Sequence, residues 1–257
     1  MNLYEAISVR KSVHQFVMEP LEKETLKKIV SFYEAICPLF PGIRTEIGIT
    51  EQVSGTHKKA GPFGFRAPYY LSIYSEKRDR SDMNAGFIGQ QLCLYMTILG
   101  IGNTFVCGSG MADVPEEHDG RKLVIQIAFG RAKVSIFRRP HEIRRLSMKE
   151  LCVFKEPPLP WMNQVLDAAR RAPSYMNSQP WRFVVSGKRI HIFCRNGNMD
   201  RPKKWDEVNF GAMFANIAVV SDELWLDVDL IRLENISQKS FKVNQYVLSA
   251  VARTTDM

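Results

Sequence analysis

The densest group of side chains that could bind a ligand lies in the stretch Ala172–Phe183, APSYMNSQPWRF. It carries four hydroxyl or amide side chains between two prolines, namely Ser174, Asn177, Ser178 and Gln179. A simple turn needs only one Gly, Asn or Pro, so this number exceeds what local capping requires. The side chains either bond to their own loop or face a planar polar ligand, with Trp181 packed behind as an anchor.

Two further stretches have residue types suited to a ligand. Arg10–Phe16, RKSVHQF, combines a guanidinium, an ammonium and a hydroxyl, which suit an anion. The alternative is a solvated helix end, where basic side chains also interact favourably with the helix dipole. Gly100–Gly110 is glycine-rich and permits close approach of the backbone to a ligand. It follows an expected helix, whereas a dinucleotide fingerprint needs a strand before it and a helix after it.

Composition sets the class of protein. The chain has 257 residues, 45% of them hydrophobic, enough to bury the core of one large or two small domains. The formal net charge of +8 indicates either a solvated basic surface or an anionic ligand. Zinc-finger spacing, an RNA-binding aromatic signature and an Arg-rich arm are all missing from the sequence, so a basic nucleic-acid binder is the least specific alternative.

Cysteine and histidine usage argues against a metal or disulfide framework. The five cysteines are scattered and never form C-x-x-C, which is typical of a reducing compartment and disfavours disulfides or structural zinc. The five histidines form no H-E-x-x-H pattern, so no metal site is expected. The N-terminus lacks a signal-peptide pattern, and the longest apolar run, Phe210–Val220, is shorter than the roughly 20 residues of a membrane span. We therefore expect a cytoplasmic protein without membrane contact.

Hydrophobic periodicity predicts the elements that position these stretches. Helices are expected near residues 3–7, 26–36, 88–99, 162–172 and 206–221, with Gly100 ending the third and Pro173 the fourth. Strands are expected at 69–74, 123–129, 183–186, 190–194 and 246–252. Helices and strands interleave without strict βαβ regularity, which predicts an α+β fold with a mixed sheet covered by helices.

The sequence also contains a divergent internal repeat. At an offset of 136, Ile47 and Ile49 fall on Phe183 and Val185; at an offset of 125, Asn84 and Gly86 fall on Asn209 and Gly211; and at an offset of 122, Ala128 falls on Ala250. The falling offsets fit a second copy with shorter loops. A repeat of this length predicts two fused half-domains. We expect one half at residues 1–155 and the other at 156–257, packed as one globular unit.

Together these stretches resemble the FMN-dependent nitroreductase family. Arg10–Phe16 is similar to its R-R-S-[VI]-R-x-[FY] phrase, and Ala172–Phe183 to A-P-S-x-x-N-x-Q-P-W-x-F. Leu99–Gly102 is similar to L-G-[LI]-G, Ile127–Gly130 to I-A-[ILF]-G, and a basic pair precedes Pro140. The order departs from ordinary members, in which the A-P-S phrase follows the R-R-S phrase within 25–35 residues, whereas more than 160 residues separate the two phrases here. The chain therefore resembles the tandem subgroup, in which two copies form a pseudo-dimer within one polypeptide.

The resemblance implies a flavin site shared by the two halves. Phosphate ligands would be Arg10, Lys11, Ser12 and Arg138 or Arg139 from the first half. The ring and ribityl chain would meet Pro173, Ser174, Tyr175 and Asn177 from the second half, with the backbone of Gly108 and Ser109 near the ring and Lys58 and Lys59 as a further candidate cation. The first-half counterpart of the A-P-S loop, Cys37–Thr45, has lost these polar groups, so one FMN per chain and a monomeric protein are expected.

The resemblance also implies an activity. The leading hypothesis is an FMN oxidoreductase that takes hydride from NAD(P)H and reduces a nitroaromatic, a quinone or a similar small acceptor by ping-pong turnover. The flavin carries the chemistry, so no side chain is named as an acid or base. A related flavin chemistry, such as reductive dehalogenation or flavin destruction, is an alternative on the same scaffold. So is a flavin-binding module or pseudo-enzyme without turnover.

Overall fold

A computed structural model describes residues 1–54, 65–106, 114–139, 142, 144–195, 203–239 and 244–253. The N-terminal part contains helices α1 (Leu3–Val9), α2 (Lys23–Ala35) and α3 (Ser81–Ile98), and strands β1 (Thr45–Glu51), β2 (Tyr69–Ser75), β3 (Gly102–Val106), β4 (Glu117–His118) and β5 (Arg121–Gly130). The C-terminal part contains helices α4 (Met148–Leu151), α5 (Pro160–Arg170), α6 (Lys203–Glu223) and α7 (Glu234–Ser237), a 3₁₀ turn at Tyr175–Asn177, and strands β6 (Cys152–Phe154), β7 (Trp181–Ser186), β8 (Arg189–Arg195), β9 (Val228–Ile231) and β10 (Asn244–Ala252).

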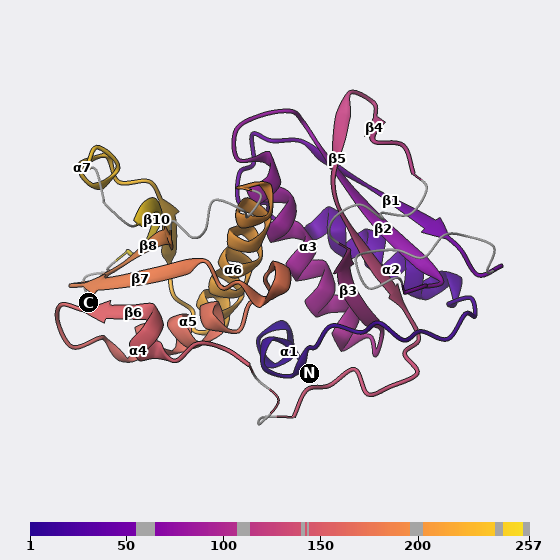
Figure 1. Cartoon of the computed structure of the whole chain (residues 1–257), viewed down its shortest axis with the longest axis horizontal. Helices are drawn as coiled ribbons and strands as arrows, with labels where there is room; N and C mark the ends of the chain where they lie inside the picture. Colours follow the sequence, from indigo (N-terminus) through magenta and orange to yellow (C-terminus); the bar gives the residue numbers. More distant parts are fainter. Residues whose placement is uncertain are drawn as a thin grey trace.

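The strands form two five-stranded sheets, one in each part of the chain (Figure 1). The first has the order β1-β2-β5-β3, with β4 also paired to β5, and all its pairs are antiparallel. The second has the order β6-β7-β8-β10-β9, and its β6–β7 pair is parallel. The α+β fold expected from the interleaved pattern is confirmed, with sheets covered by helices.

The two parts repeat one arrangement of elements. The order β1-β2-β5-β3 corresponds to β7-β8-β10-β9 in the second sheet. In register, Ile47 of β1 pairs with Ile73 of β2, and its sequence counterpart Phe183 of β7 pairs with Ile192 of β8. Each hairpin is followed by a long helix, α3 in one part and α6 in the other. The sequence offsets therefore align elements that are also equivalent in space.

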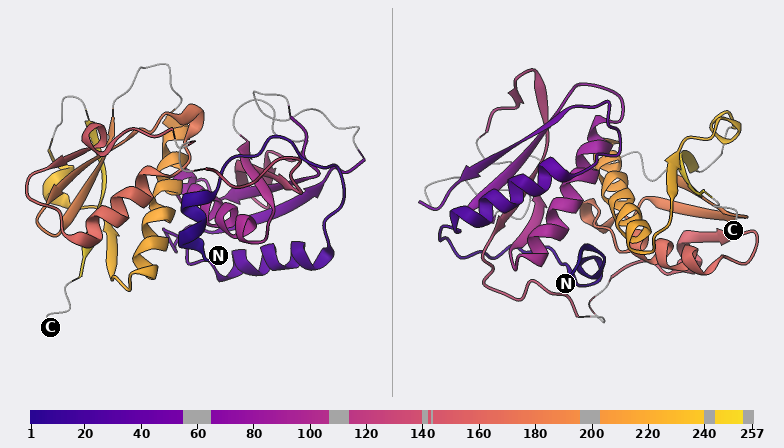
Figure 2. Two further views of the ribbon diagram at one scale, coloured as in Figure 1. Left: turned by 90° about the horizontal axis from the view of Figure 1, so that it is seen from below. Right: turned by 180° about the vertical axis from the view of Figure 1, so that it is seen from behind.

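Helices α3 and α6 lie side by side at the centre, between the two sheets (Figures 1 and 2). A Cβ atom on Gly86 of α3 would clash with the backbone of Val208 on α6, and one on Gly211 of α6 would clash with the backbone of Met83 on α3. Only glycine allows the two helix backbones to approach this closely. Because Gly86 and Gly211 are also partners in the sequence repeat, the helix crossing has an approximate twofold relationship.

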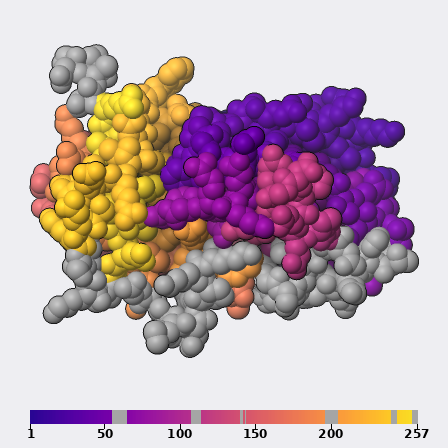
Figure 3. All heavy atoms as spheres, turned by 90° about the horizontal axis from the view of Figure 1, so that it is seen from above, coloured from indigo at the N-terminus to yellow at the C-terminus, as the bar shows by residue number. Residues whose placement is uncertain are grey.

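Segments are exchanged between the two parts. Ala6 and Ile7 of α1 are buried in the same hydrophobic cluster as Trp181 and Phe183 of the second sheet. Strand β6, which follows the first part in the chain, pairs with β7. In the surface view the N-terminal and C-terminal parts meet without a visible gap between them (Figure 3). The interface is therefore part of the hydrophobic core and not a loose contact between domains.

Two features differ from the sequence expectations. The glycine-rich stretch after α3 is in part a strand, because Gly102–Val106 forms β3 and pairs with β5. Strand β1 is not among the expected strands, although the repeat aligns its Ile47 and Ile49 with Phe183 and Val185 of β7. Gly100 follows the end of α3 with a φ of +75°, as a helix-stopping glycine should.

Within the described residues, no helix is both long enough and apolar enough to cross a membrane.

Candidate functional site

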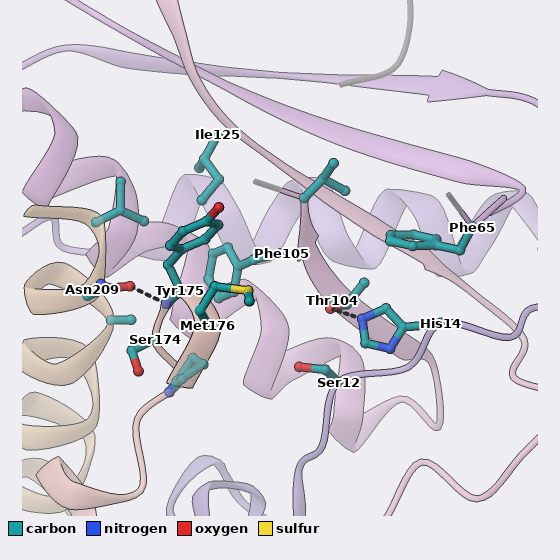
Figure 4. Close-up of a pocket in the computed structure, with 14 residues that line it drawn as sticks. Ser12, His14, Phe65, Thr104, Phe105, Ile125, Ser174, Tyr175, Met176 and Asn209 are labelled. Atoms are coloured by element: carbon teal, nitrogen blue, oxygen red, sulfur yellow. Dashed lines mark hydrogen bonds between the residues drawn. The ribbon is translucent and has the colours of Figure 1, made fainter. Parts of the chain in front are cut away.

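A cavity of about 200 Å³ lies where the two halves meet (Figure 4). The N-terminal half contributes mainly the segment around Ser12 and strand β3, and the C-terminal half contributes a loop before β7 and one face of α6. The lining residues are Ser12, His14, Phe65, Thr104, Phe105, Val106, Ile125, Pro173, Ser174, Tyr175, Met176, Val208, Asn209 and Ala212. The lining is predominantly apolar with a few polar groups, as in sites for small organic ligands and cofactors.

The first wall of the cavity is formed by the extended segment around Ser12, which runs along β3. Ser12 forms a parallel bridge with Asn103, and the N–H of Val13 donates to the Asn103 carbonyl at 3.1 Å. Side chains alternate along extended backbone. Val13 is therefore buried, with 1% of its surface exposed, while Ser12 and His14 face the cavity.

His14 supplies an imidazole to this wall. Its Nε2 lies 3.5 Å from Oγ1 of Thr104, and its ring meets Phe65 edge-on with centroids 5.1 Å apart. Burial lowers the pKa of His14. The imidazole is therefore held closer to its neutral form than a free histidine, because desolvation disfavours the charged ring.

The second wall is the loop Pro173–Gln179, which reaches across to the N-terminal half. The N–H of Tyr175 donates to Oδ1 of Asn209 at 2.8 Å, and the Tyr175 ring stacks on Trp205 with centroids 5.6 Å apart. Tyr175 also packs against the hydrophobic cluster that contains β2 and β5. The loop is thus docked on the first half's core while its own strand, β7, belongs to the second sheet.

Several polar side chains of the loop form hydrogen bonds to the neighbouring segment 144–146. Oδ1 of Asn177 accepts from Arg145 at 2.8 Å, and its Nδ2 donates to the Arg144 carbonyl at 3.1 Å. Oε1 of Gln179 accepts from the Leu146 N–H at 2.8 Å, while Oγ of Ser174 accepts from the Gln179 N–H at 3.0 Å. Some side chains of this stretch therefore bond within the protein, whereas Pro173, Ser174, Tyr175 and Met176 line the cavity.

Arg145 of this segment belongs to a group of arginines that interact electrostatically with one another. Burial and the neighbouring cations Arg10 and Arg171 lower the pKa of Arg138. Burial, and then Arg138 and Arg10, lower the pKa of Arg145 to about 10. Burial lowers the pKa of Arg10, whose side chain is 5% exposed. The three guanidiniums of Arg10, Arg138 and Arg145, here called the arginine cluster, therefore raise one another's electrostatic energy.

The arginine cluster has few carboxylates near it in the described part of the chain, where Glu142 acts on Arg138. Asp167 is paired with Arg170 and Arg171, at 2.6 and 2.7 Å. Arg10 donates to Oδ1 of Asn103 at 3.3 Å, a neutral acceptor. Among the residues that the structure describes, no salt bridge is formed by Arg10, Arg138 or Arg145. Nε of Arg145 is buried and without a hydrogen-bond partner there. Buried and half-buried cations without a salt bridge are costly, so an anionic ligand would stabilise this arrangement.

The sequence-derived candidates fall into four groups. Ser12, Pro173, Ser174 and Tyr175 line the cavity, and Arg10 and Arg138 belong to the arginine cluster. Asn177 is turned toward Arg145, Lys11 is half-buried beside Arg10 in sequence, and Arg139 is exposed with its N–H bonded to Glu142. Gly108, Ser109, Lys58 and Lys59 lie outside the described residues.

Several site residues were not among the candidates. Arg145 stands in a run of basic residues that sequence alone cannot distinguish from a solvated surface. His14, Thr104 and Phe65 reach the cavity only through the pairing of the first wall with β3. Asn209 did carry a signal, because the repeat aligned it with Asn84.

In the first half, the loop equivalent to Pro173–Gln179 makes an apolar contact and does not line the cavity. Leu39 and Phe40 pack against the hydrophobic cluster of the second half. Oδ1 of Asn84 accepts from the Phe40 N–H at 2.9 Å, as Asn209 accepts from Tyr175. Both halves therefore dock the loop through the same kind of hydrogen bond. The loop of the first half lacks the polar and cavity-lining residues of the second-half loop.

Comparisons with known proteins identify one family. The family model described as "Putative TM nitroreductase" matches residues 2–208. A crystal structure named "putative nitroreductase" from Thermotoga maritima superposes with a TM-score of 0.63 at 19% identity, covering 98% of this chain and 94% of that one. An "FMN-dependent Nitroreductase" from Clostridium difficile gives a TM-score of 0.44 at 17% identity, covering 57% of this chain and 95% of that one. A search of curated proteins finds no match.

Proposed function

The chain belongs to the TM nitroreductase family, and we propose that it is an FMN-dependent oxidoreductase that passes electrons from NAD(P)H to a small acceptor such as a nitroaromatic or a quinone. Family membership supports the reaction class. A nitroaromatic acceptor agrees with the nitroreductase name of the similar Thermotoga maritima structure, and the quinone comes from the family resemblance.

The observation that carries the proposal is the arginine cluster beside an apolar cavity. FMN combines a phosphate monoester with a flat, mostly apolar ring system, so it needs cations at one end of its site and apolar walls at the other. The buried and unpartnered Nε of Arg145 and the buried cation Arg10 supply donors for the phosphate. The cavity lined by Phe105, Val106 and Tyr175 supplies the apolar walls. The residues present therefore fit the cofactor.

We assign the residues as follows. Arg10, Arg138 and Ser12 hold the phosphate, with Lys11 and Arg139 at its edge. Pro173, Ser174 and Tyr175 contact the ring and ribityl chain, and Asn177 orders the loop that carries them. Gly108 and Ser109 remain proposed backbone donors near the ring.

When bound, the flavin supplies hydride acceptance and donation. The protein would position the cofactor through phosphate-binding residues of one half and ring-contacting residues of the other. Tyr175, Met176 and Phe105 exclude water from the cavity. The arginine cluster adds positive potential, which favours an anionic cofactor. No side chain is assigned as an acid or base, and the reductant and the acceptor use the same cavity in succession.

The proposal is tested by titrating the purified protein with FMN and following flavin fluorescence and absorbance. We expect saturable binding, anaerobic bleaching of the flavin band by NADH or NADPH, and recovery of the band when a quinone or nitroaromatic is added. A protein that binds no FMN at micromolar concentration refutes the assignment. A protein that binds FMN but is not bleached by either nicotinamide is a flavin-binding module and not a reductase.

A further inference from the structure

Arg145 connects the arginine cluster to the loop Pro173–Gln179. Its Nη1 donates to Oδ1 of Asn177 at 2.8 Å and to the Arg144 carbonyl at 3.1 Å, and its Nη2 donates to the Arg171 carbonyl at 3.3 Å. The same side chain interacts electrostatically with Arg138 and Arg10, which belong to the first half of the chain. One guanidinium therefore faces both the anion-binding residues and the second half's loop.

The loop conformation depends on such external contacts. Met176, Asn177 and Gln179 have φ values of +51°, +55° and +45°. Non-glycine residues adopt left-handed backbone only at a cost, and keep it when the surrounding structure fixes them. Asn177 is held by Arg145 and the Arg144 carbonyl, and its neighbour Met176 is 67% exposed at the cavity. Loss of the Arg145–Asn177 bond would release the cavity-lining side of the loop.

The position of Arg145 is itself electrostatically unfavourable without an anion. Four cations lower its pKa, Arg138 and Arg10 of the cluster and Arg170 and Arg171, which are paired with Asp167, and its Nε remains buried without a hydrogen-bond partner. An anion at the cluster would neutralise the repulsion and could accept from that nitrogen, since a guanidinium has five N–H donors. Binding of the anion would then favour the position of Arg145 in which its Nη1 donates to Oδ1 of Asn177.

We propose that Arg145 is a positioning residue through which a phosphate monoester, bound at Arg10 and Arg138, orders the loop Pro173–Gln179 over the cavity. The anion and the loop then share a coupling free energy, so each strengthens the other's bound or ordered state. The identity of the monoester as the FMN phosphate rests on the proposed function, but the coupling does not, because inorganic phosphate carries the same charge and acceptors.

The loop provides its own reporters for a test. Four of its backbone amides are hydrogen-bonded: those of Tyr175 to Asn209, Asn177 to the Ser174 carbonyl, Ser178 to the Tyr175 carbonyl, and Gln179 to Oγ of Ser174. Their hydrogen–deuterium exchange measures opening of the loop directly. The probes are inorganic phosphate alone, riboflavin, which lacks the phosphate, and FMN.

In the wild-type chain we expect saturating inorganic phosphate and FMN to slow exchange of these amides by about fivefold or more, and riboflavin to slow it less. Arg145→Gln should abolish the effect of phosphate. Asn177→Gly should abolish it as well, and this variant is informative even if Arg145→Gln folds poorly, because glycine accepts the left-handed backbone at Asn177 without strain. Arg131→Gln is the matched control, since Arg131 is paired with Glu19 on the surface.

The outcomes separate this inference from the proposed function. Phosphate protection that persists unchanged in Arg145→Gln or Asn177→Gly, or no protection in the wild type, overturns the coupling. Phosphate protection lost in both variants supports it, even if FMN does not bind and the proposed function fails. Conversely, the protein could bind FMN and reduce it while hydrogen–deuterium exchange of the loop amides does not depend on Arg145. That result would support the proposed function and overturn the coupling.

Discussion

The backbone N–H of Tyr175 donates to the side-chain oxygen of Asn209 at 2.8 Å, which fastens the loop before β7 to the first turns of α6. The equivalent bond in the first half joins Phe40 to Asn84 at 2.9 Å. The two loops are thus docked in the same way, but one carries Ser174 and Tyr175 at the cavity and the other carries Leu39 and Phe40 against a hydrophobic core. A polar ligand site is therefore expected at only one of the two positions.

Replacing Arg10 with alanine should weaken FMN binding. A charge-assisted guanidinium–phosphate bond contributes about 1.5–3 kcal/mol, which corresponds to a loss of roughly tenfold to a hundredfold in affinity. Fluorescence titration of wild-type and Arg10→Ala protein measures the difference, with Arg131→Ala as a surface control. Equal dissociation constants for Arg10→Ala and the wild type would remove Arg10 from the phosphate site. Because Arg10 is buried, circular dichroism of the variant should be compared first.

Gly86→Ala and Gly211→Ala should each destabilise the chain. Their new methyl groups would overlap backbone atoms of the opposite central helix, so the helices must separate at a cost of about 1–3 kcal/mol or more. Gly42→Ala is the matched control, because a Cβ there meets no atom within 4 Å. Urea unfolding of the three variants tests this, and a Gly86→Ala protein as stable as Gly42→Ala would contradict the close crossing of α3 and α6.

Stability should fall on mild acidification, in part through His191. Burial, followed by Arg189 and Lys155, lowers the pKa of His191 from its usual 6.5, and its Nδ1 lies 2.8 Å from Oγ of Ser249. Below about pH 6.5 the unfolded chain therefore binds more protons at this residue than the folded chain does, and the free energy of unfolding decreases as pH falls. His14 acts in the same direction.

The measurement compares urea unfolding at about pH 7.5 and about pH 5.5 for the wild type and His191→Gln. The variant should lose less stability between the two values than the wild type. An equal loss would show that His191 does not contribute to the acid sensitivity.

Turnover should follow ping-pong kinetics. The structure has one cavity at the proposed ring position, and the reductant and the acceptor must use it in turn. Initial rates at several fixed acceptor concentrations should give parallel double-reciprocal lines. Intersecting lines would indicate a ternary complex and a separate binding position for one substrate.

The fold could be predicted from the sequence largely because its periodicities are strong. The expected strand at 69–74 is β2, and the expected helix at 162–172 is close to α5. The repeat offsets also aligned β1 with β7 and Gly86 with Gly211. Strand β3 was not predicted, because glycines and polar residues in Gly102–Val106 weaken strand propensity and its pairing with β5 decides its conformation. The packing of α1 against the second half and the pairing of β6 with β7 are tertiary contacts, and the local sequence pattern does not predict them.

The candidate site was predictable only where residues form a continuous phrase. Ser12 and Arg10 share one segment, and Pro173 to Asn177 share another, so their patterns are visible in the sequence. Arg145 was missed because its environment comes from Asn177, Arg171 and Arg138, which are brought together by folding. The partners of Asn177 and Gln179 have no signal in the sequence for the same reason, and Asn177 contacts Arg145 and the Arg144 carbonyl while its contact with a ligand stays a prediction.

The most direct test of the account is the number of FMN molecules per chain, measured by flavin absorbance against protein concentration together with light scattering. Among the described residues, one position combines an arginine cluster with a cavity-lining loop from the other half, and the apolar interface between the halves is already internal. We therefore predict one FMN per chain at saturation and a monomer in solution. Two FMN per chain, or FMN bound only by an obligate dimer, would contradict a single site shared between the two halves of one polypeptide.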